Sequence, residues 1–128
     1  MFYGKTNPTE QEFSEMKIKR FGSVIELIAL KEQEYRRLHA DVWPSILERL
    51  KRSHIQNYSV FIQSIENKKY LFSYFEYVGC DYESDMKEIA EDPITKKWWT
   101  LTDACQQKLP DCQSGEQWNQ MEMVFLME

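Results

Sequence analysis

The spacing of hydrophobic residues changes from strand-like to helical close to residue 30. Residues 21–30 form an apolar run rich in β-branched side chains, which predicts a well-buried strand. Residues 31–53 instead carry apolar side chains at steps of three and four, the spacing of one helical face. Because Pro44 lacks an N–H and disfavours helical geometry at Trp43, we expect this helix to break there and restart with Pro44 in a first turn. The inward face comprises Tyr35, Leu38, His39, Val42, Ile46 and Leu50.

Two more strands are predicted over residues 55–66 and 69–78, with a turn at Asn67-Lys68 between them. Asp81 is expected to cap a second helix, and Asp92-Pro93 supplies a cap and a first-turn proline for a third. The inward residues are Tyr58, Val60 and Ile62 in the first of these strands, and Ile94, Trp98, Leu101 and Cys105 in the third helix. After a loop at 110–115, alternation between residues 121 and 127 predicts a last strand.

The order β-α-β-β-α-β is that of a ferredoxin-like α+β fold, with helices covering one face of the sheet. The other face is rich in Phe, Tyr, Val and Met, and an apolar patch of that size is normally closed by a partner. We therefore expect a homodimer packed sheet against sheet, a dimeric α/β barrel, with a pocket between each sheet and its helices or near the barrel mouth. Residues 20–128 would form this domain, and the polar residues 1–19 a flexible N-terminal arm outside the core.

Length and charge narrow the possible partners. The 128 residues, 42% of them hydrophobic, suffice for one domain with a single core. The net charge of −5 argues against binding to nucleic acid or to an anionic membrane, since both need clustered Lys and Arg. No segment approaches the roughly 20 apolar residues of a membrane span. No basic stretch leads into an apolar leader, so we expect a cytoplasmic protein.

The sequence offers little to hold a cofactor or a metal. Four scattered glycines cannot form a phosphate loop, and two histidines fifteen positions apart lack a third metal ligand. Cys80, Cys105 and Cys112 fit neither a disulfide framework nor a zinc site. We therefore expect any catalysis to proceed without cofactor or metal.

Tyr35 and His39 are the strongest local signal for chemistry. They lie four positions apart and so share one helical face, where a histidine can titrate near neutral pH beside a hydroxyl group. Spacing alone favours the simpler interpretation, a buried histidine that bonds to a backbone carbonyl or to the Tyr35 hydroxyl. His54 follows basic residues at a helix end, where the helix dipole explains a cation, and we expect no role for it.

Three further aromatic residues could border a ligand. Trp98 and Trp99 diverge by about 100° on a helix, so the first can join the core while the second borders a cavity or a subunit contact. Indole rings pack against the apolar faces of sugars and donate one hydrogen bond. Tyr58 opens a strand, and an inward tyrosine hydroxyl needs a partner in the protein or in a ligand.

Seven short sequence elements occur in an order that points to a known family. They are E-Y-R-R-L-H at 34–39, V-W-P at 42–44, K-R-S-H at 51–54, N-Y at 57–58, F-E-Y at 75–77, W-W at 98–99 and M-V-F at 123–125. Over about residues 20–128 this order resembles the L-rhamnose mutarotase family. The segment 79–86 suggests a branch of the family whose sugar is another 6-deoxyhexose, such as L-fucose. One departure is Ser45, because the family commonly has an acidic residue after Trp-Pro.

The resemblance implies a dimeric α+β barrel that interconverts sugar anomers without a cofactor. It also implies roles by matching position, with His39 as the proton donor and Tyr35, Tyr58, Trp98 and Trp99 as sugar contacts. Two other functions fit the composition and fold. One is a cofactor-free monooxygenase of the same architecture, which a largely apolar pocket around His39 would favour. The other is a small-ligand-binding module without catalysis.

Overall fold

The computed structural model describes residues 2–128 and contains one antiparallel sheet. Its strands are β1 (Lys19–Leu27), β2 (Ile55–Ile65), β3 (Lys68–Tyr77), and the short β4 (Gln106–Gln107) and β5 (Asn119–Met121). The strand order is β2-β3-β1-β4, and β5 pairs with β1 further along the same edge. This order is that of the ferredoxin-like arrangement, so the predicted α+β fold is confirmed.

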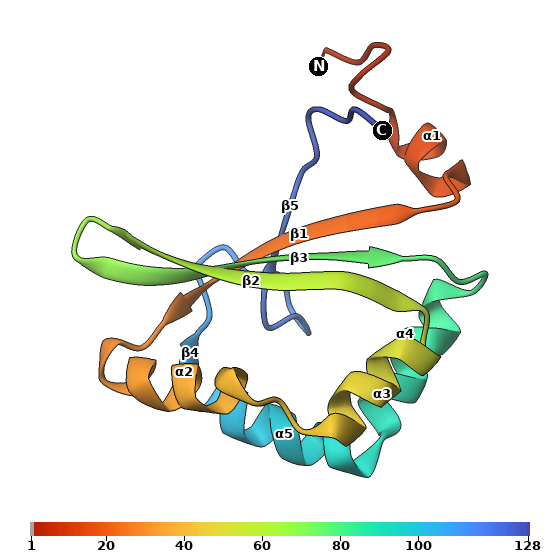
Figure 1. Ribbon diagram of the computed structural model, residues 1–128. Coiled ribbons are helices and arrows are strands. Elements are labelled where there is room, and N and C mark those ends of the chain that lie inside the picture. Colours follow the sequence, from red (N-terminus) through yellow and green to blue (C-terminus); the bar gives the residue numbers. More distant parts are fainter. Residues whose placement is uncertain (1) are drawn as a thin grey trace.

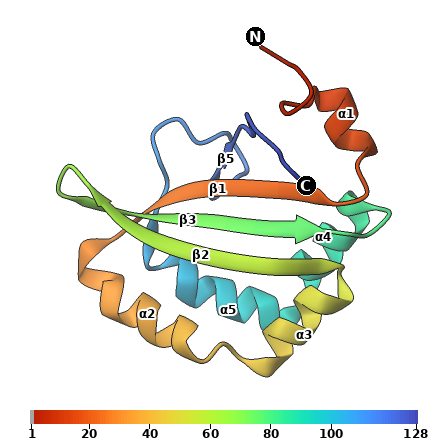
Figure 2. The ribbon, with the colours of Figure 1, turned by 45° about the horizontal axis from the view of Figure 1, so that its top comes forward.

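Four helices cover one face of the sheet (Figures 1 and 2). They are α2 (Glu32–Ala40), which follows the short η1 (Ala29–Lys31), then α3 (Pro44–Arg52), α4 (Tyr82–Glu91) and α5 (Pro93–Asp103). The buried apolar residues form three clusters. Two join the sheet to the helices and are centred on Ile25 and Leu71 and on Ile55 and Tyr77, and the third lies among the helices, around Leu38 and Trp98. In the part of the chain that the structure describes, no helix has the length and apolar character needed to cross a bilayer.

The helix boundaries follow local sequence signals. Trp43 adopts extended backbone angles and Pro44 opens α3 in its first turn, so the predicted break is confirmed. The side chain of Asp81 accepts a hydrogen bond from the backbone N–H of Ser84, and Asp92 accepts one from Thr95, at 3.1 and 2.9 Å. Both predicted caps are therefore present.

The hairpin turn lies one position before the predicted one. Glu66 and Asn67 are its central residues, with φ of 48° and 69°, and Ile65 pairs with Lys68. A two-residue hairpin turn of this type needs positive φ at both central positions because its twist then matches that of the strands. The position of Asn67, second rather than first in the turn, fixes the register of β2 against β3.

The inward face of α5 also differs from the prediction. Ile94 and Leu101 are 41% and 38% exposed, while Thr95, Trp98 and Thr102 are buried. Asp92 explains the threonine at the start of the helix, because its carboxylate accepts from both the backbone N–H and the hydroxyl of Thr95. The cap thus allows a threonine to be buried where hydrophobicity alone favoured isoleucine.

The predicted last strand over 121–127 is wrong beyond Met121. β5 ends there, and the chain then leaves the sheet, with Val124, Phe125 and Met127 more than 60% exposed. The backbone N–H of Leu126 donates to the carbonyl of Thr6 at 2.7 Å, so the backbone of this segment bonds to the N-terminal residues and not to β1 (Figure 1). Alternating hydrophobicity indicates extended backbone but does not specify a pairing partner.

The expected N-terminal arm contains α1 (Glu10–Glu15), which is capped by Thr9 and Glu12. Phe13 from this helix packs edge-to-face on Phe21 of β1, with ring centroids 5.7 Å apart. Met1, the first residue of the expected arm, lies outside the described residues. The division of the chain at residue 19 remains a prediction.

Candidate functional site

A cavity of about 230 Å³ lies between α2 and β2. Its volume is below the roughly 300–1,000 Å³ of drug-sized sites, which suits a ligand as small as a monosaccharide. The helix contributes the polar wall and the strand an apolar one. The lining residues are Tyr35, Arg36, His39 and Ala40 from α2 and Val60 and Ile62 from β2.

Tyr35 and His39 meet at the wall of this cavity. Their rings stack with centroids 4.1 Å apart and planes inclined by 24°. Tyr35 is buried in the core cluster of Ile25, Leu27 and Leu71, whereas His39 is half-buried. The four-residue spacing therefore places an anchored aromatic ring directly against the imidazole.

The backbone selects the tautomer of His39. Its Nδ1 lies 3.0 Å from the main-chain carbonyl oxygen of Tyr35. Because a carbonyl oxygen only accepts, Nδ1 carries the proton, and Nε2 of the neutral ring keeps its lone pair. Burial lowers the pKa of His39, against the opposing effect of this hydrogen bond, so the neutral ring is favoured. His39 thus presents a proton acceptor at Nε2.

The two tyrosine hydroxyls near the cavity remain protonated. Burial raises the pKa of Tyr35 strongly, the proximity of Tyr58 adds to the rise, and a hydrogen bond with Gln106 opposes it. Burial also raises the pKa of Tyr58, although 48% of that residue is exposed. Both groups are therefore hydrogen-bond donors near neutral pH.

A β-bulge directs Tyr58 toward the helix side of the sheet. The pairing of β2 with β3 shifts register between Gln56 and Ser59, and Asn57 has a φ of 49°. After the bulge, Tyr58 shares a face with Val60 and its ring lies 5.4 Å from that of Phe75. Tyr58 thus lies on the same face of β2 as the strand residues that line the cavity.

The two tryptophans occupy different environments. Trp98 is buried, and its ring meets His39 edge-on at 5.3 Å and Trp43 at 5.1 Å. Trp99 is 39% exposed and, as the next residue of α5, points to another side of the helix. The structure therefore brings Tyr35, His39 and Trp98 into one contact group and leaves Trp99 at the surface of α5.

Arg36 is a cavity residue that the sequence analysis did not select. It follows Tyr35 directly and precedes His39 by three positions, and residues three apart share a helical face. This three-residue spacing from His39 is the sequence signal that could have identified Arg36 as a cavity residue.

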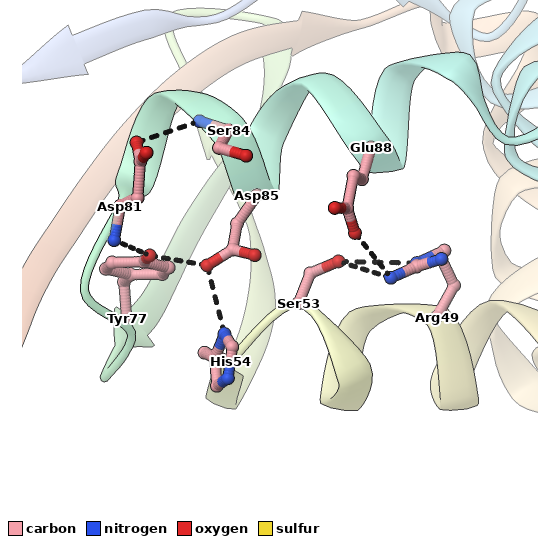
Figure 3. Close-up of polar contacts among 8 residues, drawn as sticks. All are labelled: Arg49, Ser53, His54, Tyr77, Asp81, Ser84, Asp85 and Glu88. Atoms are coloured by element: carbon pink, nitrogen blue, oxygen red, sulfur yellow. Dashed lines mark hydrogen bonds and ion pairs between the residues drawn. The ribbon is translucent and has the colours of Figure 1, made fainter.

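A second polar cluster joins α3, the turn that follows it, β3 and α4 (Figure 3). Asp85 accepts hydrogen bonds at one carboxylate oxygen from the Tyr77 hydroxyl and from Nδ1 of His54, the latter at 3.0 Å. Both hydrogen bonds lower the pKa of Asp85, that of Tyr77 contributing most. His54, in the turn directly before β2, has a φ of 66°, and its contact with Asp85 links this turn to α4. No spacing in the sequence could have indicated a partner 31 positions away.

A larger hollow of about 460 Å³ lies between η1, α2 and α5 and contains none of the candidate residues. Within residues 2–128, no three His, Cys, Asp or Glu side chains gather as metal ligands. The arrangement around His39 can move protons and donate hydrogen bonds.

Comparison with known proteins gives a consistent result. The family model of L-rhamnose mutarotase matches residues 20–127. An L-rhamnose mutarotase of Oceanobacillus iheyensis is 33% identical over 82 residues, which are 64% of this chain and 74% of that protein. One of Lactiplantibacillus plantarum is 35% identical over 80 residues, 62% of this chain and 72% of that protein.

The fold also matches a solved structure. The crystal structure of an L-rhamnose mutarotase from Formosa agariphila superimposes with a TM-score of 0.63 and 28% identity, covering 86% of this chain and 99% of that one. The chain belongs to the L-rhamnose mutarotase family and is an isomerase that acts on carbohydrates.

Proposed function

We propose that this protein interconverts the α and β anomers of L-rhamnose, with L-fucose as a second 6-deoxyhexose substrate. The observation that carries the proposal is the state of His39, which lines a monosaccharide-sized cavity and whose Nδ1 is bonded to the backbone, so that Nε2 is the ring nitrogen left to accept a proton. Sugar mutarotation needs one group that can accept and return a proton, together with groups that orient the sugar.

The reaction balances with His39 as the only proton carrier. Nε2 accepts the proton of the anomeric hydroxyl as the bond between C1 and the ring oxygen breaks, and the resulting imidazolium donates a proton to that ring oxygen. The product is the open-chain aldehyde. Rotation about C1–C2 and the reverse transfers close the ring with the other configuration. His39 thus acts first as a base and then as the proton donor that the family resemblance implies.

The neighbouring aromatic residues have supporting roles in this proposal. The Tyr35 hydroxyl donates to a sugar oxygen and its ring fixes the plane of the imidazole. Tyr58, Trp98 and Trp99 keep the role of sugar contacts that the family resemblance implies, and Trp98 also packs edge-on against His39. The polar groups of Tyr35 and Arg36 beside His39 favour a sugar over the aromatic substrates of a monooxygenase.

The apolar wall favours a sugar without a hydroxyl group at C6. Ala40, Val60 and Ile62 offer no hydrogen-bond partner from their side chains, so they suit a methyl group. A 6-hydroxyl placed there would lose its hydrogen bonds to water. L-mannose differs from L-rhamnose only by that hydroxyl, whereas L-fucose keeps the methyl and differs at C2 and C4.

Magnetisation-transfer NMR with these three sugars tests the substrate proposal. We expect the enzyme to accelerate anomer exchange of L-rhamnose most, L-fucose next and L-mannose least. Equal acceleration of all three would contradict the assignment of the apolar wall to C6. Saturable binding without acceleration would support a binding module instead.

A homodimer is part of the proposal. Val24, Phe72 and Phe61 lie in register across β1, β3 and β2, on the face opposite to that of the buried Ser23 and Ser73, and Phe61 is 61% exposed. Sheet-to-sheet packing of two copies would cover this row. A stable monomer in sedimentation at micromolar concentration would contradict it.

A cytoplasmic location is also proposed. Cys80, Cys105 and Cys112 are free thiols, and thiols persist in a reducing compartment. Cell fractionation tests this location.

A further inference from the structure

Arg36 lines the cavity beside the two candidate reaction groups, yet the proposed proton transfers do not use it. In that reaction Tyr35 and His39 interact with the oxygen at C1 and with the ring oxygen. A hexose carries further hydroxyl groups, each of which loses hydrogen bonds to water on binding unless the protein replaces them. The cavity wall contributed by β2 cannot do so with its side chains, because Val60 and Ile62 are apolar.

The guanidinium of Arg36 is held by a chain of ion pairs. Its Nε donates to Oε2 of Glu32 at 2.8 Å, and Oε1 of Glu32 lies 2.7 Å from Nζ of Lys69. Glu32 thus bridges two cations with its two oxygens, and Lys69 comes from β3. These hydrogen bonds, that of Lys69 first, lower the pKa of Glu32, so the bridge stays ionised at neutral pH.

The bridge occupies only one of the three nitrogens of Arg36. Within the described residues, Glu32 is the recorded hydrogen-bond partner of this guanidinium, and the bond is made through Nε. A bond at Nε restrains the direction of the guanidinium, because the group is flat and rigid. The two terminal nitrogens keep their N–H groups for a ligand.

The adjacent arginine provides a contrast. Arg37 donates to Glu34 through both Nε and Nη2, at 3.2 and 2.6 Å, on the outer side of α2. Both side chains are exposed, at 59% for Arg36 and 69% for Arg37, but only Arg36 belongs to the cavity wall. The two neighbouring arginines therefore have different contacts. Arg37 forms a two-bond ion pair with Glu34 at the surface, whereas Arg36 is bonded to Glu32 through one nitrogen beside the cavity.

We infer that Arg36 is a substrate-binding residue, whose terminal N–H groups donate to sugar hydroxyls away from C1, and that Glu32 and Lys69 are its positioning residues. This inference rests on the proposed function, because it assigns part of the same sugar site. Arg36 makes this contact with the bound sugar both in the ground state and in the transition state of ring opening. Its loss therefore raises KM and leaves kcat nearly unchanged.

Steady-state anomer exchange at varied L-rhamnose concentration tests this inference by separating KM from kcat. For Arg36→Met, which keeps the length of the side chain, we expect KM to rise about tenfold or more. Arg36→Lys should recover part of the loss, and Glu32→Gln should give an intermediate KM. The matched control Arg37→Met should keep the KM of the wild type. Circular dichroism verifies that each variant is folded.

The outcomes separate this inference from the proposed function. An unchanged KM in Arg36→Met, or equal shifts in Arg36→Met and Arg37→Met, would overturn the role of Arg36 alone. If the wild-type protein binds L-rhamnose without accelerating exchange, the proposed function fails, and titration of Arg36→Met by NMR chemical shifts still tests the contact. A wild-type protein that neither binds nor converts the sugar would overturn both.

Discussion

Nδ1 of His39 lies 3.0 Å from the carbonyl oxygen of Tyr35, one helical turn earlier in α2. This contact decides which nitrogen of the imidazole is available for chemistry, since the carbonyl oxygen can only accept a hydrogen bond. Main-chain geometry of a single helix thus leaves Nε2 as a base at the cavity, while the ring of Tyr35 fixes the plane of the imidazole. Trp98 adds an edge-on contact to the same imidazole.

The first prediction concerns the dependence of rate on pH. The reaction begins with neutral His39, and burial lowers the pKa of that group from its ordinary value of 6.5. The rate should therefore be constant at neutral pH and fall as the pH falls through a value below 6.5, where the imidazole becomes protonated. Exchange NMR between pH 5 and 8, corrected for the spontaneous rate in buffer, measures this profile. A rate that rises toward acid would contradict the base role.

The second prediction separates the two tryptophans. Trp98 is buried against His39 and Trp43, so Trp98→Ala should lower the free energy of unfolding by about 3–5 kcal/mol. Trp99→Ala, at an exposed position, should cost less than about 1 kcal/mol and raise KM for the sugar. Urea denaturation and exchange kinetics measure the two effects. If Trp99→Ala keeps the wild-type KM, Trp99 is not a sugar contact.

The third prediction concerns the polar cluster around Asp85. A Cβ added at Gly79 would overlap the Tyr77 hydroxyl and lie 2.7 Å from Oδ2 of Asp85. Gly79→Ala should therefore separate these two groups and destabilise the protein by about 1–3 kcal/mol. Gly4→Ala is the matched control, because nothing lies within 4 Å of a Cβ added there. Equal denaturation midpoints for the two variants would show that the cluster contributes nothing to stability.

Features that depend on neighbouring residues could be predicted from the sequence. Pro44 determines the break between α2 and α3, because a missing N–H acts within one turn. Asp81 and Asp92 cap their helices for an equally local reason. The same holds for the site, since Tyr35 and His39 share a face wherever α2 forms.

Features that depend on distant residues could not be predicted from the sequence. Asp85 meets His54 and Tyr77 only after the sheet and α4 have packed. The chain after Met121 alternates as a strand does, but its recorded backbone partner, Thr6, lies at the other end of the sequence. Arg36 is an intermediate case, because its place on the helix face follows from spacing, whereas its link to Lys69 follows only from the fold.

The most direct test of the central claim is the rate of L-rhamnose anomer exchange, measured by NMR for the wild-type protein and for His39→Ala at pH 7. We expect the wild-type protein to accelerate exchange and His39→Ala to lose about 100-fold or more of that acceleration. Arg37→Ala, another α2 substitution, serves as a control that should keep the wild-type rate. A folded His39→Ala protein that retains the wild-type rate would contradict the assignment of His39 as the proton carrier.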